Sequence, residues 1–520
     1  MKTLRSHICG QWHEANDGFA TLVNPSTEEP IAQVSSAGID FGAVVDYARN
    51  HGGPALRALT FAERAALLKA MSKAIREHRD ELLELSRDNN GTSKGGGAFD
   101  IDGASGTLAY YASVGKKIGD RKALPEGDGV QLARTEAFWG QHVLVPRQGV
   151  AVHINAFNFP AWGMAEKAAC ALLAGMPVIT KPATATALAA ERIAEILVEA
   201  NILPAGALQF VCGSTGDLLD HLGPQDVVAF TGSADTALRL RNHEGLRAAS
   251  TRFNVEADSL NAAVLAPDVE PGSPTFDFFI RDVAREMTQK AGQKCTAVRR
   301  ILVTSERLPD VQEALVAKLS RTVVGNPADD SVRMGPLATA HQLADAEEGV
   351  AELSKVARVI HGGTRVDGVG APAGKGFFFG PTLLLADDVR GAADVHRREV
   401  FGPVATLLPF DGSAREAAEI VGLGGGTLVT SAYGDDDAWM GDFLAGVGSF
   451  TGRLYVGNAE SAEAAFGSGS ALPQLLHGGP GRAGGGEELG GLVGLGLYLQ
   501  RLAVQGSRPQ VETLAQLETE

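Results

Sequence analysis

Between residues 149 and 232 the chain alternates short apolar runs with helical stretches, and this alternation restricts its fold more than any other feature. Four runs have the length and composition of buried strands: 149–160, 176–180, 208–213 and 227–232. Helical stretches at 162–173 and 186–200 separate the first three runs. Strands that alternate with helices at this spacing form βαβ units. The sequence therefore predicts an α/β fold built on a parallel sheet.

Polar and glycine-containing motifs lie where these predicted strands end. They are NAFNFP (155–160), KPAT (181–184), CGSTG (212–216) and FTGS (230–233). Parallel sheets bind ligands at the carboxyl ends of their strands. These four motifs therefore predict one ligand site at a single edge of the sheet.

Three further segments have a predicted structure. Apolar residues at three- and four-residue intervals predict a helix over about 55–87. A second α/β pattern begins at about 262, with a strand at 299–305 after a helix that ends near Gly292. The glycine-rich segment 466–496 has the composition of a flexible linker, but its fixed charges favour a loop whose backbone approaches another segment closely. The tail after about 505 is expected to be partly disordered or to dock on a neighbour.

Composition excludes several classes of function. The formal net charge is -16, which argues against a nucleic-acid surface, and no run of about 18 apolar residues predicts a membrane span. The four cysteines are far apart and form no CxxC pair, so neither a disulfide framework nor a metal site is expected. The N-terminus lacks a signal-peptide pattern, and we expect a cytoplasmic protein. The commonest NTPase, zinc-protease and hydrolase motifs are also missing.

Cys295, in GQKCTAVRR, is a candidate nucleophile. The neighbouring Lys294, Arg299 and Arg300 can lower the pKa of its thiol if the fold directs them toward it. Taken alone, a single cysteine is more often a small buried hydrophobic residue.

Glu256, in NVEADSLN, is a candidate general base. It follows an apolar strand, and burial in a cleft would raise its pKa. The alternative is a surface glutamate or a helix cap, which is the more common state of such a residue.

Three of the strand-end motifs contain candidate binding groups. The amide of Asn158 can donate to an oxyanion, although asparagine before a proline is usually a turn residue. Lys181 can bind a ribose hydroxyl or a phosphate, although a lysine at a strand end is usually solvated. Gly232 and Ser233 open a helix and can hold a phosphate, but the GxGxxG fingerprint is missing there.

Together and in this order, the motifs resemble those of the aldehyde dehydrogenase superfamily. NAFNFP resembles the family's PWNFP segment, FTGSADT its phosphate-side turn, and EVFGPV (399–404) its EIFGPV motif. NVEADSLN and GQKCTA lie where the family has its general base and its nucleophile, and HGGPGRAGGGEELGG (477–491) resembles its C-terminal glycine-rich motif. The likeness covers nearly the whole chain.

The resemblance implies a role for each matching residue. Cys295 adds to the aldehyde carbon, the amide of Asn158 stabilises the resulting oxyanion, hydride passes to a nicotinamide, and Glu256 activates the water that hydrolyses the thioester. The cofactor-binding residues that it implies are Ile154, Asn155, Phe157, Lys181, Ala183, Thr184, Gly213, Gly216, Phe230, Thr231, Gly232, Ser233, Glu399 and Phe401.

Departures from the family pattern are informative. Most NAD-preferring relatives have a glutamate three residues after the lysine, where this chain has Thr184. A carboxylate would repel the 2′-phosphate of NADP, whereas threonine can donate to it, so NADP is the expected cofactor and NAD remains possible. Ala237 replaces a glycine near the phosphate turn, Gly481 a lysine, and His477 the family's phenylalanine. The change at His477 implies a different pocket.

With these departures, the sequence resembles a narrower group, the enzymes that oxidise CoA-linked semialdehydes in aerobic aromatic degradation. Chain length favours the 3,4-dehydroadipyl-CoA semialdehyde dehydrogenases of benzoate degradation. Details such as LPQLLHGGP and AVQGS favour the aldehyde dehydrogenase part of the phenylacetate-degradation bifunctional protein. The expected partner is therefore a CoA-linked aldehyde. There are three alternatives: oxidation of a different aldehyde, a CoA-acylating reaction, and an inactive relative that serves as a structural or binding protein. The presence of Glu256 argues against CoA-acylation. The presence of Cys295, Glu256 and Asn158 argues against an inactive protein.

The resemblance also implies a domain organisation. The expected cofactor domain comprises residues 1–127 and 147–255, and the expected catalytic domain comprises residues 256–465. A small β element, 128–146 and 485–520, is expected to bridge subunits. Because such an element covers an exposed sheet edge, a homodimer or a dimer of dimers is expected.

Overall fold

The computed structural model describes residues 1–516, and a seven-stranded sheet forms the centre of its N-terminal half. In spatial order its strands are β12 (Arg252–Glu256), β11 (Val227–Thr231), β8 (Ala151–Ile154), β9 (Val178–Lys181), β10 (Leu208–Phe210), β2 (Ser6–Ile8) and β3 (Gln11–His13). The first five are parallel, and the last two are antiparallel. The predicted parallel sheet is therefore confirmed, and all four of its predicted strands belong to it.

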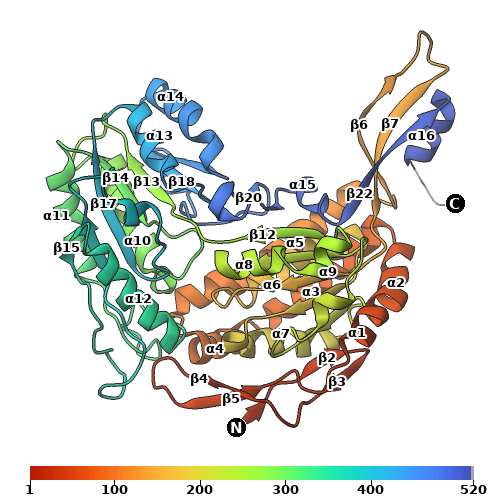
Figure 1. Ribbon diagram of the computed structural model, residues 1–520, viewed down its shortest axis with the longest axis horizontal. Coiled ribbons are helices and arrows are strands. Elements are labelled where there is room, and N and C mark those ends of the chain that lie inside the picture. The colour runs from red at the N-terminus through yellow and green to blue at the C-terminus, as the bar shows by residue number, and fades with distance from the viewer. Residues whose placement is uncertain (517–520) are drawn as a thin grey trace.

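Helices cover this sheet and bury its apolar side chains (Figure 1). They are α1 (Phe41–Tyr47), α2 (Gly53–Ala58), α3 (Phe61–Glu77), α4 (Arg79–Asn90), α5 (Lys94–Ile118), α6 (Trp162–Ala174), α7 (Ala187–Glu199), α8 (Ala234–Arg241) and α9 (Glu244–Ala248). Helices α6 and α7 connect consecutive parallel strands, as the sequence predicts. The strands are buried on both faces, which explains why they are continuous apolar runs.

The prediction of one helix over 55–87 is wrong, because this region contains three helices. Thr60 begins α3 with a capping box: its side chain accepts a hydrogen bond from the Glu63 backbone, and the Glu63 side chain accepts one from Thr60. His78, in a non-helical conformation, separates α3 from α4. Apolar periodicity continues across both breaks, which is why it did not reveal them.

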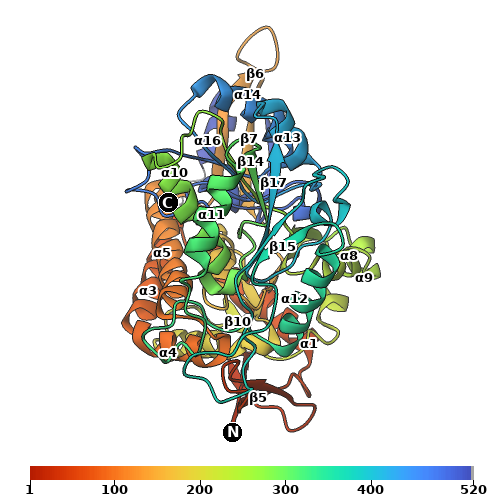
Figure 2. The same ribbon diagram turned by 90° about the vertical axis from the view of Figure 1, so that its left-hand side faces the viewer.

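A second seven-stranded sheet forms the other half of the molecule (Figure 2). In spatial order its strands are β15 (Arg358–His361), β16 (Thr382–Leu385), β17 (Val404–Phe410), β14 (Arg300–Thr304), β13 (Ala262–Leu265), β18 (Thr430–Tyr433) and β19 (Leu454–Gly457). All except β15 are parallel. Its helices are α10 (Pro274–Thr288), α11 (Leu308–Leu319), α12 (Ala340–Leu353), α13 (Ala414–Gly422) and α14 (Asp437–Val447). The predicted second α/β pattern is confirmed.

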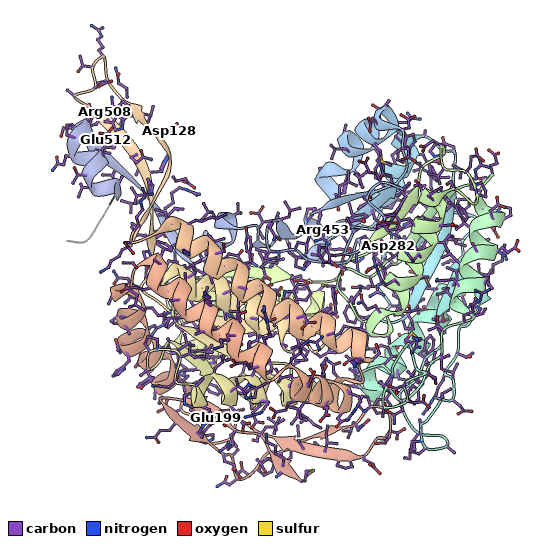
Figure 3. All side chains as sticks on the ribbon, turned by 180° about the vertical axis from the view of Figure 1, so that it is seen from behind. Asp128, Glu199, Asp282, Arg453, Arg508 and Glu512 are labelled. Carbon is purple, nitrogen blue, oxygen red and sulfur yellow. The ribbon has the colours of Figure 1, made fainter. Side chains whose placement is uncertain are left out.

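A three-stranded antiparallel sheet projects from the body (Figure 1). It consists of β6 (Leu124–Gln131), β7 (Trp139–Pro146) and β22 (Leu499–Gly506). Its first strand thus begins four residues before the expected boundary at 128. Helix α16 (Arg508–Gln516), which carries Arg508 and Glu512, lies beside this sheet (Figure 3), and Arg508 pairs with Glu136 at 2.7 Å. The last part of the expected bridging element, 517–520, lies outside the described residues.

The remaining elements are short. A small sheet contains β1 (Lys2–Thr3), β4 (Ala20–Val23) and β5 (Pro30–Val34); a two-stranded sheet contains β20 (Leu476–Gly478) and β21 (Glu487–Leu489), and α15 (Leu492–Leu495) follows it. In residues 1–516, no helix combines the length and the apolarity that a membrane crossing requires.

The glycine-rich C-terminal segment approaches the first sheet closely. A Cβ atom on Gly484 would lie 2.2 Å from the carbonyl oxygen of Val255 in β12. The Ala257 amide donates to the carbonyl of Ala483. The predicted close backbone approach is confirmed, and it brings β20 beside the end of β12.

Candidate active site

Cys295 lies in a tight loop that follows α10. Lys290, Ala291 and Gly292 all have left-handed backbone conformations, with φ near +54°, +54° and +67°. A Cβ atom on Gly292 would lie 2.2 Å from the carbonyl oxygen of Gly402, so only glycine fits there. The Asn261 amide donates to the Cys295 carbonyl at 2.7 Å. The loop is thus fixed against the EVFGPV segment, and the thiol faces the end of the first sheet.

The neighbours of the thiol are not those that the sequence suggests. The amine of Lys294 bonds Glu286 and Gln289, while the guanidinium of Arg300 donates to backbone carbonyls on the far side of the loop. Arg299 pairs with Glu399. Burial in the pocket and the charge of Glu256 raise the pKa of Cys295 well above its usual range. The condition for a lowered pKa, that these cations point at the thiol, is not met, because Lys294, Arg299 and Arg300 bond other groups.

Glu256 is the last residue of β12, and its side chain is buried. Its Oε2 lies 3.3 Å from Nε2 of His477, and its Oε1 has no hydrogen-bond partner among the described residues. Burial opposes ionisation, but His477 and Lys167 outweigh it and lower the pKa of Glu256. The expected rise in this pKa is therefore wrong, because two basic side chains from remote segments surround the carboxylate.

Asn158 follows β8 and lies beside the cysteine loop. Its side chain is buried, and one N–H donates to the carbonyl of Gln293 at 3.0 Å. A carboxamide has two N–H donors, so the other is left for a ligand. Because Asn158, Glu256 and Cys295 line the same pocket, the structure brings together the three predicted catalytic side chains.

The pocket around Cys295 is narrow and has mainly apolar walls. It is lined by Phe99, Ala156, Asn158, Phe159, Trp162, Gly163, Glu166, Lys167, Thr231, Glu256, Cys295, Thr296, Gly469, Ala471 and His477. Arg453 donates to the carbonyls of Ser468 and Ser470, and Asp282 accepts from the Ser468 amide. Arg453 and Asp282 are labelled in Figure 3. These contacts fix the 468–470 loop that forms one wall of the pocket.

A larger cleft opens on the other side of Cys295. Its volume is about 570 Å³, which is within the usual range for small-molecule and cofactor sites. The predicted cofactor residues that line it are Asn155, Phe157, Ala183, Phe230, Thr231, Gly232, Ser233, Glu399 and Phe401. The cleft therefore reaches from the FTGS turn to the cysteine, as a bound dinucleotide would.

Five predicted cofactor residues do not line this cleft: Ile154, Lys181, Thr184, Gly213 and Gly216. Ile154 and Lys181 are buried at strand ends. The hydroxyl of Thr184 donates to the carbonyl of Gly213 at 3.2 Å. Gly213 and Gly216 lie against Ser35 and Phe41, respectively.

The donor set of the cleft fits a dinucleotide. Gly232 and Ser233, at the start of α8, line the cleft, and the positive end of the helix dipole favours a phosphate there. The Oδ1 atom of Asn155 and the Oγ1 atom of Thr231 are buried in its wall without partners among the described residues. Buried polar atoms are normally paired, so these orphaned atoms indicate a polar ligand. A dinucleotide supplies both phosphates and ribose hydroxyls for such groups.

Glu399 lies at the end of the cleft next to Cys295. It accepts a hydrogen bond from the Ser259 amide at 3.0 Å and one from Arg299 at 3.2 Å. Burial raises the pKa of Glu399 to about 7, although Arg299 opposes this shift. Phe401 packs edge-on against Phe157 and helps to hold this segment at the cleft.

Several pocket residues were not among the predicted site residues. His477 was noted only as a departure from a family pattern, yet its Nε2 lies 3.9 Å from the sulfur of Cys295. The amine of Lys167 lies 3.0 Å from Glu166 and 3.1 Å from Glu488. Charged residues in the apolar helix around Lys167 were a usable signal, because buried charges require partners. No local sequence pattern indicates that β20 contacts β12.

A family model gives the deciding comparison. Residues 12–467 match the model described as "Aldehyde dehydrogenase family". The chain belongs to the aldehyde dehydrogenase family. The predicted family and fold class are thus confirmed, and nicotinamide dinucleotide chemistry accompanies that membership.

Comparisons with individual aldehyde dehydrogenases support the same family assignment. The chain is 47% identical over 478 residues to 3,4-dehydroadipyl-CoA semialdehyde dehydrogenase of Aromatoleum evansii, covering 92% of this chain and 93% of that one. It is 30% identical to the NADP(+) succinate-semialdehyde dehydrogenase GabD of Escherichia coli K12, covering 79% of this chain and 81% of the other. The crystal structure of a putative aldehyde dehydrogenase from Burkholderia cenocepacia superposes with a TM-score of 0.84 at 26% identity, covering 98% of both chains. The resemblance to the CoA-linked semialdehyde group is confirmed.

Proposed function

We propose that this aldehyde dehydrogenase oxidises the aldehyde end of a CoA-linked semialdehyde to a carboxylic acid, with NADP as the preferred hydride acceptor. The observation that carries the substrate class is the 47% identity, over nearly the full length of both chains, to a CoA-linked semialdehyde dehydrogenase. The proposed setting is aerobic, CoA-dependent catabolism of phenylacetate or benzoate in the cytoplasm.

The side chains around Cys295 account for formation of the thioester. The thiolate of Cys295 adds to the aldehyde carbon, which gives a thiohemiacetal. The free N–H of Asn158 and the backbone N–H of Cys295 stabilise its oxyanion. A nicotinamide dinucleotide bound in the cleft would supply the hydride acceptor for the thiohemiacetal carbon, and Glu399, which lines the cleft with Cys295, would help to hold it.

Glu256 accounts for the second half-reaction. Its unpaired Oε1 faces the pocket that contains Cys295. It accepts a proton from water while the water oxygen attacks the thioester carbon, and the thiolate of Cys295 leaves. A CoA-acylating enzyme has no need of a base at this position, so the placement of Glu256 favours hydrolysis.

NADP preference rests on the adenosine end of the site. Thr184 places no negative charge beside the 2′-position of the ribose, where a carboxylate would repel a phosphate. The similarity to a relative named for NADP(+) supports the same assignment.

The projecting sheet is proposed to pair with a second copy of the chain. Strand β6 is an edge strand of this sheet, and an exposed edge is a template for pairing with another strand. A homodimer or a dimer of dimers covers such edges.

One assay tests the substrate and the cofactor together. Purified protein receives a CoA-linked semialdehyde or the free semialdehyde of equal chain length, with NADP or NAD, while the reduced cofactor is followed by its absorbance. We expect kcat/KM to be higher by about 10-fold or more for the CoA-linked substrate and for NADP, which corresponds to about 1.4 kcal/mol. The Cys295→Ala variant is the background control. Equal kcat/KM with and without CoA would contradict the substrate class, and faster turnover with NAD would contradict the cofactor assignment.

A further inference from the structure

Three elements that are remote in sequence bring a carboxylate, a thiol and an imidazole together. Glu256 ends β12, Cys295 lies in the loop after α10, and His477 is the middle residue of β20. One ligand atom of each lies within 4.8 Å of those of the other two. Nε2 of His477 is 3.3 Å from the Glu256 carboxylate and 3.9 Å from the Cys295 sulfur. The imidazole therefore contacts both other members of the cluster.

The thiol of Cys295 needs a base. The thiolate is the nucleophile, yet burial and the charge of Glu256 raise the pKa of Cys295 and keep it protonated at neutral pH. Lys294 and Arg299 pair with Glu286 and Glu399 rather than with the sulfur. A group within reach of the sulfur must take the proton when the nucleophile forms.

Two groups lie close enough, and their basicities differ. The surroundings of Glu256 lower its pKa, and a weaker base accepts a thiol proton less readily. Burial lowers the basicity of His477, but the Glu256 carboxylate outweighs this effect and raises the pKa of the imidazole. The stronger base of the two is therefore the imidazole. The carboxylate at 3.3 Å stabilises the cation that results.

We propose that His477 is a catalytic residue that accepts the thiol proton of Cys295 as the nucleophile forms, with Glu256 as its charge partner. The inference rests on the proposed role of Cys295 as the nucleophile. The S–H bond breaks and its electron pair stays on sulfur, while an N–H bond forms at Nε2 of His477. When hydrolysis releases the thiolate, the imidazolium returns the same proton, so the cycle restores both groups. Catalytic contacts that are long in a free enzyme tighten when substrate binds, and 3.9 Å is within the reach of such a movement.

The surroundings of His477 stabilise the imidazolium that forms when it accepts the proton. The charged and titratable groups around it are Glu256, Cys295, Glu166, Lys167, Glu488 and Arg453. Glu488 lies directly opposite His477 in the β20–β21 ladder. The nearest carboxylate is that of Glu256, and the side chain of His477 is only 4% exposed. The imidazolium is thus formed in a pocket where water screens its charge partner weakly.

Alkylation of the cysteine tests the proposal without substrate or cofactor. The full chain is treated with iodoacetamide over a range of pH, and modification of each cysteine is measured by peptide mass. Cys9, in the turn between β2 and β3, is partly exposed and serves as an internal reference. Wild type, His477→Phe and Glu256→Gln are compared; the first variant introduces the apolar residue that resembles the family's.

The expected result is specific to Cys295. In His477→Phe its alkylation at neutral pH falls by about 10-fold or more, and its pH profile moves to higher pH, while the profile of Cys9 is unchanged. Glu256→Gln has a smaller effect, because it removes the charge partner but leaves the imidazole. A Cys295 profile that is unchanged in His477→Phe would overturn the proposal, as would a larger loss in Glu256→Gln.

Chemical rescue separates a proton acceptor from a packing residue. In His477→Ala, added imidazole can occupy the space left by the side chain, and we expect it to restore Cys295 alkylation in a concentration-dependent manner. An equal concentration of a non-basic azole should not restore it. Equal rescue by both compounds, or by neither, would contradict the role of His477 as a base. Failure of the proposed function gives a different result from failure of the His477 proposal. If Cys295 is not the nucleophile, dehydrogenase activity survives in Cys295→Ala, whatever the alkylation profile shows.

Discussion

The substrate pocket and the nucleotide cleft meet at Cys295 but are built in different ways. The pocket encloses only about 40 Å³ and is lined by aromatic side chains and buried charged groups, whereas the cleft has about 570 Å³ and is lined largely by strand-end turns. Five residues line both: Ala156, Asn158, Thr231, Glu256 and Cys295. Chemistry in the pocket depends on individual side chains from remote segments, while the cleft is formed mainly by the sheet itself. Changes in the pocket should therefore lower kcat, and changes in the cleft should alter KM for the nucleotide.

The largest expected effect is that of Cys295→Ala. Loss of the sulfur removes the covalent route, so turnover should fall by at least about 10³-fold. Nucleotide affinity, measured by fluorescence titration, should change little, because the cleft keeps its other walls. Cys9→Ser is the matched control and should retain activity. Equal losses in both variants would show that the effect is one of folding.

Asn158→Ala should have the next largest effect. Removal of one oxyanion donor typically lowers kcat by about 10²–10³-fold. The KM for the aldehyde should change little, because the contact strengthens only as negative charge develops. Asn326→Ala is a matched control: its amide donates to the carbonyl of Gly370 at 3.4 Å, outside the pocket and the cleft. A rise in KM for the aldehyde with unchanged kcat would place Asn158 in ground-state binding instead.

Thr184→Glu should act on nucleotide binding alone, because Thr184 follows Ala183, which lines the cleft. A carboxylate beside the 2′-phosphate should raise the KM for NADP by about 10-fold, with kcat close to that of the wild type. The KM for NAD should fall, and Thr184→Gln is the uncharged control. Equal changes for both nucleotides would contradict an adenosine-ribose contact at this position.

The smallest predicted effect is the pH dependence of nucleotide binding through Glu399. Its pKa of about 7 means that its carboxylate is ionised above neutral pH and protonated below it. Only the ionised form accepts hydrogen bonds from two ribose hydroxyls, so affinity should rise a few-fold, roughly 2–5-fold, as pH increases through 7. Glu399→Gln should bind more weakly at high pH and lose this dependence. Persistence of the pH effect in the variant would assign it to another group.

The sequence predicts the fold better than it predicts the electrostatics of the site. The strands and helices between 149 and 232 follow from local apolar patterns, because each element is buried in a regular way. The break at Thr60 was missed because a cap changes the backbone without interrupting the pattern.

The electrostatic predictions failed because the charges that act on the site come from distant segments. Lys294 and Arg300 are near Cys295 in sequence, but their side chains bond other groups. The pKa of Glu256 depends on His477 of β20 and Lys167 of α6, both of which are remote from Glu256 in sequence. The three catalytic candidates themselves were identified by family resemblance, and the structure shows that they share one pocket.

Trapping of the acyl-enzyme tests the central claim most directly. Glu256→Gln should form the thioester but hydrolyse it about 10²–10⁴-fold more slowly than wild type. The variant is mixed with CoA-linked semialdehyde and NADP, quenched in acid, and digested for peptide mass measurement. We predict a burst of reduced cofactor of one equivalent per active site and an acyl adduct on Cys295. A burst without an adduct on Cys295, or an adduct on Cys9, Cys170 or Cys212 instead, would contradict the account.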